Sequence, residues 1–301
     1  MRKIKKLKLG VPTGAIQSPA LKLFPQAGYD LKFEEESYRA SIDDPEIDCL
    51  VTRPIEIAPF VEKGVLDAGI STEAAILESG ARVKKLCDFS YDVGKKAVIV
   101  LAAPENSSIK SLKDFKGKKI LTRIPKITKE FLRKNKTSAQ VIFSDIGVAP
   151  SNIVKVPLIA DATVEFIVEI VDAPIKDALK EFNFKILEVL MENPTVLIVN
   201  EKSLQNKWKR EKIEDLAILL KGTRIAQEYS GLMLHASNEM MEEVLKVLPS
   251  LKKPTITHLR GENWFDVLTV AKKKEIRNII PKLKKIGCTD IVEFPLNKVI
   301  I

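Results

Sequence analysis

The chain has 301 residues, of which 45% are hydrophobic and 30% are charged, and its formal net charge is +9 at pH 7. This length and balance predict a globular protein of two or three domains, and no apolar run approaches the roughly 18 residues that a membrane span needs. The basic residues are interleaved with acidic ones and aromatic residues make up only 6%, which argues against nucleic-acid binding and leaves a small phosphorylated ligand as a partner that fits the charge.

The basic start of the chain, MRKIKKLKLGVP, has an apolar part that is too short and too interrupted for a signal peptide, so we expect a cytoplasmic location. The cysteines, Cys49, Cys87 and Cys288, are odd in number and far apart in the sequence. This spacing argues against a disulfide framework and against a zinc site. We expect no metal site made by the protein and a core position for each cysteine.

The first part of the chain alternates between strand-like and helix-like segments. Residues 4–12 (IKKLKLGVP) predict a strand that ends in a turn, and Ser18-Pro19 predicts the start of a helix. Residues 47–54 (IDCLVTRP) predict a second strand, and residues 66–71 (LDAGIS) a third strand that opens into the helix 72–80 (TEAAILESG). This rhythm predicts a largely parallel sheet with ligands at the carboxyl ends of its strands.

A second unit begins near residue 97 and repeats the alternation. Its pattern cannot separate helix from strand over residues 160–170 (ADATVEFIVEI). The other predicted elements are an apolar stretch at 95–104, a short helix and strand within 111–125, a helix at 127–135, strands at 140–145 and 152–157, a strand at 193–204 that returns to the first unit, and a long amphipathic helix at 208–228.

The rhythm changes from about Gly231 onwards. The pattern predicts a strand at 231–237, a helix at 238–251 capped by Ser237, strands at 254–259 and 264–271, a helix at 275–287 closed by Gly287, and a strand at 289–296. The order βαββαβ is that of a small ferredoxin-like module. Such modules bind small ligands or mediate oligomerisation, and the fold alone does not choose between the two roles.

Several stretches, spread over nearly the whole chain, carry a family likeness. They are LGVPTGAIQSPALKLFPQAGYDL (9–31), CLVTRPIEIAPFVEKGVLDAGISTEAAILES (49–79), VIVLAAPENSSIKSLKDFKGKKILTRIPKITKEFL (98–132), LPSLKKPTITHL (248–259) followed by Trp264, and LKKIGCTDIVEFPLNKVI (283–300). In these stretches the chain resembles the long form of the ATP phosphoribosyltransferases. The resemblance implies an α/β fold with a bilobed catalytic region like that of type II periplasmic binding proteins. Residues 1–97 and 193–226 would form lobe I, residues 98–192 lobe II, and residues 227–301 a C-terminal regulatory ferredoxin-like domain.

The resemblance also implies a reaction. Members of the family are glycosyltransferases of histidine biosynthesis, which join N1 of the adenine of ATP to C1 of phosphoribosyl pyrophosphate and release pyrophosphate. Mg²⁺ accompanies the pyrophosphate substrate and neutralises the leaving group. Histidine binds the C-terminal domain as a feedback inhibitor, and the chains assemble as homo-oligomers, either dimers or hexamers.

The family holds the ribose phosphate with an acidic pair, D-x-x-x-D, followed by S-T-G. Aligning ATVE (162–165) with the family's G-S-V-E places Asp172 and Asp177 on the two aspartates, one residue further apart than usual. Glu165, Asp172 and Asp177 are therefore the candidate catalytic residues. The S-T-G turn falls on KEFN (180–183), which lacks glycine and threonine, so the usual phosphate cradle of backbone N–H groups is predicted to be missing.

A second departure lies in the opening turn. The family reads P-K-G-R-L, whereas this chain reads PTGAI, with Thr13 and Ala15 in place of both basic residues while Gly14 keeps the turn. Lys95 and Lys96 fall where the family carries arginine. We take Thr13, Gly14, Lys95 and Lys96 as substrate-binding candidates.

The stretch 49–79 is the most specific match to the family, and it contributes four further candidate site residues. Arg53 follows a strand and is either an anion contact or a surface ion-pair partner. Asp67, Gly69 and Thr72 are assigned to a strand-to-helix junction, where Gly69 would permit close approach of a ligand and Thr72 would either cap the helix or contact the ligand.

In the second unit, Thr122, Pro125 and Thr128 resemble the family's nucleotide wall, although Thr128 is equally a plain helix N-cap. Both histidines, His235 and His258, fall in the C-terminal module. A catalytic histidine in the lobes is therefore excluded, and a structural role is predicted for His258.

Three functions stay open at this point. The first is an active ATP phosphoribosyltransferase with an unusual phosphate loop. The second is a catalytically degenerate or repurposed paralogue that binds another small molecule in the bilobed cleft, which the altered turns favour. The third is a different transferase that acts on another phosphorylated sugar or nucleotide.

Overall fold

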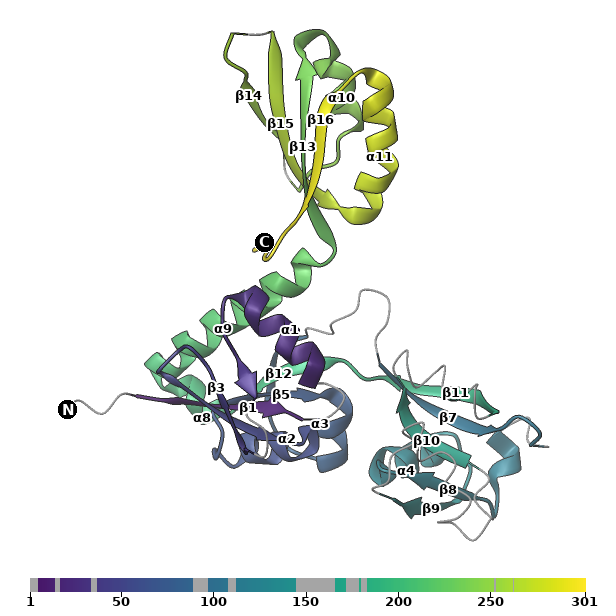
Figure 1. The fold of residues 1–301 in the computed structure, drawn as a ribbon. Helices are drawn as coiled ribbons and strands as arrows, with labels where there is room; N and C mark the ends of the chain where they lie inside the picture. The colour runs from purple at the N-terminus through teal and green to yellow at the C-terminus, as the bar shows by residue number, and fades with distance from the viewer. Residues whose placement is uncertain are drawn as a thin grey trace. The chain divides into compact units, whose positions relative to one another are not determined.

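The computed structural model describes residues 5–13, 17–33, 37–88, 97–107, 112–144, 166–171, 179, 183–251, 253–261 and 263–301 (Figure 1). These residues form three β-sheets. The chain divides into two compact units, one made of Met1–Leu21 and Asp30–Glu214 and the other of Lys22–Tyr29 and Asp215–Ile301.

The first sheet has the strand order β2-β3-β4-β1-β5-β12-β6. Its central strands β1 (Leu7–Pro12), β4 (Ile47–Thr52) and β5 (Ala68–Thr72) run parallel, as the sequence predicts. The remaining strands pair antiparallel with their neighbours; they are β2 (Lys32–Phe33), β3 (Arg39–Ser41), β12 (Thr195–Val199) and β6 (Lys84–Asp88). The sheet is therefore mixed, and its parallel part is confined to the centre.

Helix α2 (Pro54–Glu62) follows β4 and packs on the first sheet. It begins with Pro54 at its first helical position, where the missing N–H of proline costs no hydrogen bond. Its buried face consists of Ile57, Ala58 and Val61, which pack with Leu66 and with residues of β12. Helix α1 (Gln17–Ala27) follows β1, and helix α3 (Glu73–Ser79) follows β5.

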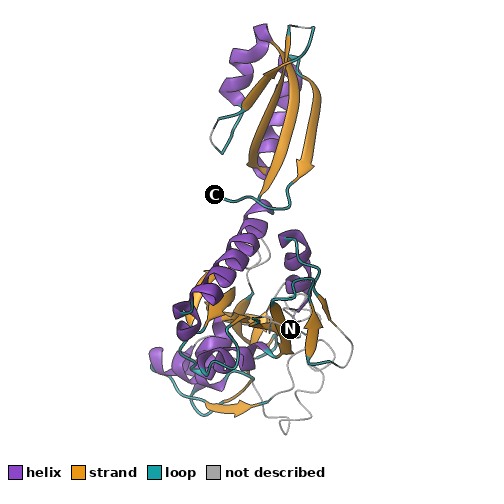
Figure 2. Cartoon of the chain, turned by 90° about the vertical axis from the view of Figure 1, so that its left-hand side faces the viewer, coloured by secondary structure: helices purple, strands orange, loops and turns teal. Residues whose placement is uncertain are grey.

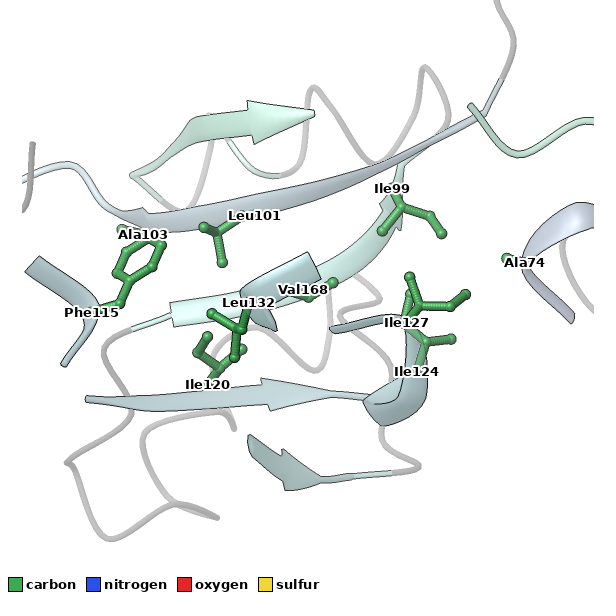
Figure 3. Close-up of a cluster of buried hydrophobic side chains, with 10 residues drawn as sticks. All are labelled: Ala74, Ile99, Leu101, Ala103, Phe115, Ile120, Ile124, Ile127, Leu132 and Val168. Atoms are coloured by element: carbon green, nitrogen blue, oxygen red, sulfur yellow. The ribbon is translucent and has the colours of Figure 1, made fainter. Parts of the chain in front are cut away.

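The second sheet is formed by the part of the chain between β6 and β12. Its order is β11-β7-β10-β8-β9, and β10 and β9 both pair parallel with β8. The elements are β7 (Val98–Pro104), a 3₁₀ turn η2 (Leu112–Phe115), β8 (Lys119–Thr122), helix α4 (Pro125–Lys134), β9 (Gln140–Phe143), β10 (Phe166–Val171) and β11 (Phe184–Glu192). Figure 3 shows the apolar cluster of this region, in which Phe115, Ile120 and Leu132 lie together.

After β12, helix α8 (Glu201–Gln205) and the long helix α9 (Lys207–Ala226) lead to the third sheet. Its elements are β13 (Tyr229–Ser237), the 3₁₀ turn η3 (Asn238–Met240), α10 (Met241–Val247), β14 (Thr255–His258), β15 (Trp264–Lys272), α11 (Lys273–Ile286) and β16 (Thr289–Pro295). All pairs in the order β14-β15-β13-β16 are antiparallel. Figure 2 shows both helices against one face of this sheet, where they enclose a core that includes Leu232, Val267 and Leu283.

The predicted fold class is confirmed, including the ferredoxin-like order of the C-terminal module. The predicted helix 238–251 is shorter than expected because Leu248 precedes Pro249, which disfavours helical backbone at Leu248. The undecided segment 160–170 contains the start of strand β10, and the predicted strand 152–157 lies outside the described residues. Strands β2, β3, β6 and β11 were not predicted. The residue boundaries of the three predicted domains stay a prediction.

Candidate functional site

Three predicted site residues lie at or just beyond the carboxyl ends of the parallel strands of the first sheet. Thr13 follows β1, Arg53 follows β4, and Thr72 ends β5. The strands keep this edge aligned because Pro12 pairs with Thr52 and the Thr13 N–H donates to the Thr52 carbonyl oxygen at 2.9 Å. Ligands of open parallel sheets bind at this edge, so these residues are the best-placed part of the predicted site.

Arg53 occupies the N-cap position of α2, and its side chain is 59% exposed. Its Nη2 donates to Glu56 Oε1 at 2.9 Å, while its backbone N–H and the Thr52 hydroxyl donate to Glu56 Oε2. The hydrogen bond from the Arg53 side chain, followed by the one from Thr52, lowers the pKa of Glu56. A charged Glu56 thus orients the guanidinium at the sheet edge, where a phosphate oxygen could take the place of the carboxylate.

Thr72 caps α3, and the first N–H groups of that helix are already bonded within the protein. Its hydroxyl oxygen accepts a hydrogen bond from Ala75 N at 3.2 Å, and its residue is 5% exposed. The Ala74 N–H donates to Asn193 Oδ1 at 2.8 Å, and the Glu73 N–H donates to the Pro194 carbonyl at 3.0 Å. The first three N–H groups of α3 therefore all have protein acceptors.

The structure separates Asp67 from Thr72, which corrects the expectation that both lie at one strand-to-helix junction. Asp67 precedes β5 and so lies at the amino end of that strand. It is 3% exposed, its Oδ2 accepts from Lys8 N at 2.9 Å, and its Oδ1 accepts from Ser203 Oγ at 2.7 Å and from Lys209 Nζ at 2.6 Å. These contacts hold α8 and α9 against the first sheet.

Gly69 lies inside β5, opposite Gly10 of β1. A methyl group on Gly69 would come within 2.4 Å of Ile57 Cγ2. The absence of a side chain at Gly69 is thus required by the close packing of α2 on the sheet, rather than by space for a ligand at this point of the strand.

In the second sheet, Thr122, Pro125 and Thr128 come together around the start of α4. Thr122 Oγ1 accepts from Ile124 N at 3.0 Å, and the Thr128 hydroxyl donates to the Ile124 carbonyl at 2.8 Å. Both threonines are buried, at 3% and 0% exposure. Thr128 is not the N-cap, which is Ile124. The contribution of these three residues to a nucleotide site stays a prediction.

The remaining candidates cannot be placed. Gly14, Lys95, Lys96, Glu165, Asp172 and Asp177 lie outside the described residues, and with them most of the predicted phosphate cradle. Within the described ranges, no group of three or more His, Cys, Asp and Glu side chains is arranged to hold a metal ion. In the same part of the chain, no helix has the length and apolar character that crossing a membrane would take.

Two residues that the sequence did not single out connect the elements of the site. Glu78 on α3 accepts hydrogen bonds from the start of α4, and Asn193 joins α3 to the segment that leads into β12. The only signal for Asn193 is its place before Pro194, and Glu78 looks like any acidic residue on a short helix. Their roles depend on partners 48 to 119 residues away.

In the C-terminal module, His235 lies on β13 between carboxylates of the neighbouring strands. Its Nδ1 is 3.0 Å from Asp290 Oδ2, and its Nε2 is 4.0 Å from Asp266 Oδ1. His258 packs edge-on against Phe265 with ring centroids 5.1 Å apart, which is consistent with the structural role expected for it.

One family model and the relatives matched by sequence are described as ATP phosphoribosyltransferases. A family model described as ATP phosphoribosyltransferase matches residues 53–222, and one described as HisG, C-terminal domain, matches residues 226–298. An ATP phosphoribosyltransferase of Pelotomaculum thermopropionicum is 37% identical over 297 residues, which cover 98% of this chain and 99% of the relative. One of Thermodesulfovibrio yellowstonii is 37% identical over 300 residues, or 99% of both chains.

Among solved structures, the ATP phosphoribosyl transferase (HisG:HisZ) complex from Thermotoga maritima matches 71% of this chain and 98% of that chain, with a TM-score of 0.56 and 22% identity. This likeness concerns the fold alone. The sequence matches cover the sheet edge at Arg53, the second sheet and the C-terminal module. The chain therefore belongs to the ATP phosphoribosyltransferase family.

Proposed function

We propose that the chain is an ATP phosphoribosyltransferase of the long form, which catalyses the first step of histidine biosynthesis. In this reaction N1 of the adenine of ATP forms a bond to C1 of phosphoribosyl pyrophosphate, and the C1–O bond to pyrophosphate breaks. The observation that carries the proposal is the 37% identity to relatives of that name over 98–99% of both chains. The same likeness favours this function over the degenerate paralogue, because the relatives are named for the active enzyme.

The geometry of the first sheet supports a defined part for Arg53. A guanidinium binds phosphate oxygens with two parallel hydrogen bonds and keeps its charge at all relevant pH values. Glu56 holds the Arg53 side chain at the carboxyl edge of β4 before the substrate arrives. On binding, a phosphate group of either substrate would replace Glu56 as the acceptor, and the buried hydroxyl of Thr72 would keep α3 in place beside it.

The metal belongs to the substrate in this proposal. Mg²⁺ enters with phosphoribosyl pyrophosphate and neutralises the departing pyrophosphate. Histidine binding at residues 227–301, assembly into dimers or hexamers, and a cytoplasmic location are parts of the same proposal. The ribose contacts of Glu165, Asp172 and Asp177, and the substrate contacts of Thr13, Gly14, Lys95 and Lys96, also remain proposals.

A direct assay tests the function. The purified chain is mixed with ATP, phosphoribosyl pyrophosphate and Mg²⁺, and pyrophosphate and phosphoribosyl-ATP are measured together. We expect both products in equal amounts. A folded protein without turnover would contradict the proposal, and stabilisation in a thermal-shift screen by a ligand outside this reaction would then identify a repurposed relative.

Arg53→Ala sharpens this assay. The substitution is expected to raise KM for one of the phosphorylated substrates by about tenfold or more, the effect of losing a charge-assisted phosphate contact. Arg39→Ala is the matched control, because Arg39 is 70% exposed and makes a comparable 2.8 Å ion pair with Asp48, which lies near the amino end of β4 whereas Arg53 follows its carboxyl end. Equal kcat and KM values for the two variants would show that Arg53 does not bind a substrate.

A further inference from the structure

The start of α4 lacks the local cap that most helices have. The first N–H groups of a helix have no partner within the helix and are usually satisfied by a Ser, Thr, Asp or Asn side chain at the N-cap. Here the N-cap is Ile124, which has no such group, and Pro125 has no N–H. Thr128 N donates to the Ile124 carbonyl at 3.1 Å, which leaves the N–H groups of Lys126 and Ile127 to be satisfied.

Glu78 supplies both missing acceptors from another part of the chain. Its Oε1 accepts from Lys126 N at 2.9 Å and its Oε2 accepts from Ile127 N at 3.0 Å. The carboxylate is carried by α3, next to the first sheet, and α4 belongs to the second sheet. A negative charge is favourable at this place because the helix dipole is positive at its N-terminus.

The same face of α3 also makes an apolar contact with the second sheet. Ala74 lies four residues before Glu78, which places both side chains on one side of the helix. Ala74 is fully buried and belongs to the cluster that contains Ile124 and Ile127. Figure 3 shows Ala74 facing the end of this cluster where Ile99, Ile124 and Ile127 lie.

The position of α3 is itself fixed at its other end. Asn193 accepts from Ala74 N through Oδ1, and its own N–H donates to the Ala97 carbonyl at 2.7 Å. Ala97 and Asn193 are the residues at which the chain enters and leaves the second sheet. The start of α3 is therefore bonded to Asn193, beside the two points where the chain enters and leaves the second sheet, and the end of α3 is bonded to α4.

We propose that Glu78 is a positioning residue of the transferase reaction. It holds the first turn of α4, with Thr122, Pro125 and Thr128, at a set place relative to the sheet edge formed by Arg53 and Thr72. The proposal rests on the proposed function, because it concerns substrates that are held by groups from both sheets. Glu78 does not touch the reacting atoms; it acts through α4.

Glu78→Gln tests this role in the full-length chain. The amide side chain keeps one acceptor oxygen but presents an NH₂ donor where the second acceptor was, so one of the two N–H groups loses its partner. Glu62→Gln is the matched control, because Glu62 Oε1 accepts from Arg82 N at 3.1 Å in a contact that stays within the first sheet region. Amide hydrogen exchange over residues 125–128, melting temperature, kcat and both KM values are measured for each variant.

We expect Glu78→Gln to speed exchange over residues 125–128 about three- to fivefold, the range that a charged contact at a helix N-terminus corresponds to. Its KM for one substrate should rise by a similar factor, while its melting temperature matches that of Glu62→Gln. Unchanged exchange would show that the cap does not form in solution. Faster exchange with kinetics equal to those of Glu62→Gln would reduce Glu78 to a stabilising contact and overturn the proposal.

The wild-type chain in the same assay separates this proposal from the one on which it rests. If the wild type is inactive, the proposed function fails and the positioning role fails with it, although the cap can still be seen by exchange. If the wild type is active and Glu78→Gln behaves like the control, only the role of Glu78 is refuted.

Discussion

At the scale of single residues, the buried carboxylate of Asp67 has a donor for each of its oxygens. Lys8 N contacts Oδ2, and Ser203 and Lys209 contact Oδ1. A buried acceptor with several donors costs free energy when it is replaced, because each donor left behind is desolvated without a partner. Asp67 is thus expected to act in folding rather than in substrate binding.

Asp67→Asn is therefore expected to lower the free energy of unfolding by about 1–3 kcal/mol and to leave both KM values within about twofold of the wild type. Urea unfolding and steady-state kinetics measure the two quantities. Asp48→Asn is the control, since Asp48 pairs with the exposed Arg39 and surface pairs contribute little. A raised KM with an unchanged free energy of unfolding would show that Asp67 acts in substrate binding.

The sequence could place Thr13, Arg53 and Thr72 because each follows the apolar residues of a parallel strand, and such ends share one edge of the sheet. It could not place Asp67, since a polar residue beside a strand is at the correct edge only if it comes after the strand. The role of Glu78 could not be predicted from the sequence for another reason. Its partners are backbone N–H groups 48 and 49 residues away, and backbone groups leave no mark in the sequence.

At the scale of elements, the crossing of α2 over β1 and β5 depends on two glycines. Gly10 and Gly69 are paired across these strands, and a methyl group on either would meet side-chain atoms of Ile57 or Leu66 within 2.7 Å. The helix can therefore approach the sheet closely, and Ile57 fills the space that the glycines leave.

Gly69→Ala is expected to lower the free energy of unfolding by about 1–3 kcal/mol through overpacking against Ile57. In an Ile57→Ala background the same substitution should cost much less, because the clashing Cγ2 is gone. Chemical denaturation of the four chains of this double-mutant cycle gives the coupling. Equal costs in both backgrounds would show that Ile57 is not what excludes a side chain from position 69.

The sequence predicted those elements that carry their own signals. Helix α11 ends at Gly287, as predicted from that glycine, and strands such as β7 have apolar runs. The missed strands β6 and β11 have mixed burial patterns without strict alternation. They are formed by pairing with distant strands, β12 and β7 respectively, so local periodicity contains little information about them.

At the scale of the whole molecule, two cysteines lie in the first sheet and the third lies in the C-terminal module. Cys49 lies in β4 and is 2% exposed, Cys288 lies in the C-terminal core and is 0% exposed, and Cys87 in β6 is half-buried. Burial, with a smaller effect from the charge of Asp48, raises the pKa of Cys49 to about 12. Burial also raises the pKa of Cys288. Both thiols therefore stay protonated and unreactive in the folded chain at pH 8.

A thiol-specific reagent at pH 8 is accordingly expected to modify at most Cys87 in the native chain and all three cysteines after unfolding. The number of modified thiols is counted by mass spectrometry along a urea series. Cys87→Ser should abolish modification of the native chain, while Cys49 and Cys288 should still be modified after unfolding. Modification of Cys49 or Cys288 without denaturant would show that the first sheet or the C-terminal core opens under native conditions.

The order of elements in the C-terminal module was predictable because its helices and strands carry local signals, such as Gly287 at the end of α11, although β14 and β15 are the only consecutive strands that pair in its described sheet. The first sheet was harder, since β12 enters between β5 and β6 after the chain has built a separate sheet. The edge strands β2 and β6, and β3 beside β2, have no sequence pattern that predicts this arrangement. It depends on which strands find each other in space, and that choice is made by packing over more than a hundred residues.

The hydrogen bond between Asn193 and Ala97 brings together the two ends of the segment that builds the second sheet. The strands that precede and follow this segment, β6 and β12, pair with each other in the first sheet, so their pairing does not depend on the length of the segment between them. An insertion or deletion within this one continuous stretch is therefore expected to leave the strand order of the first sheet unchanged.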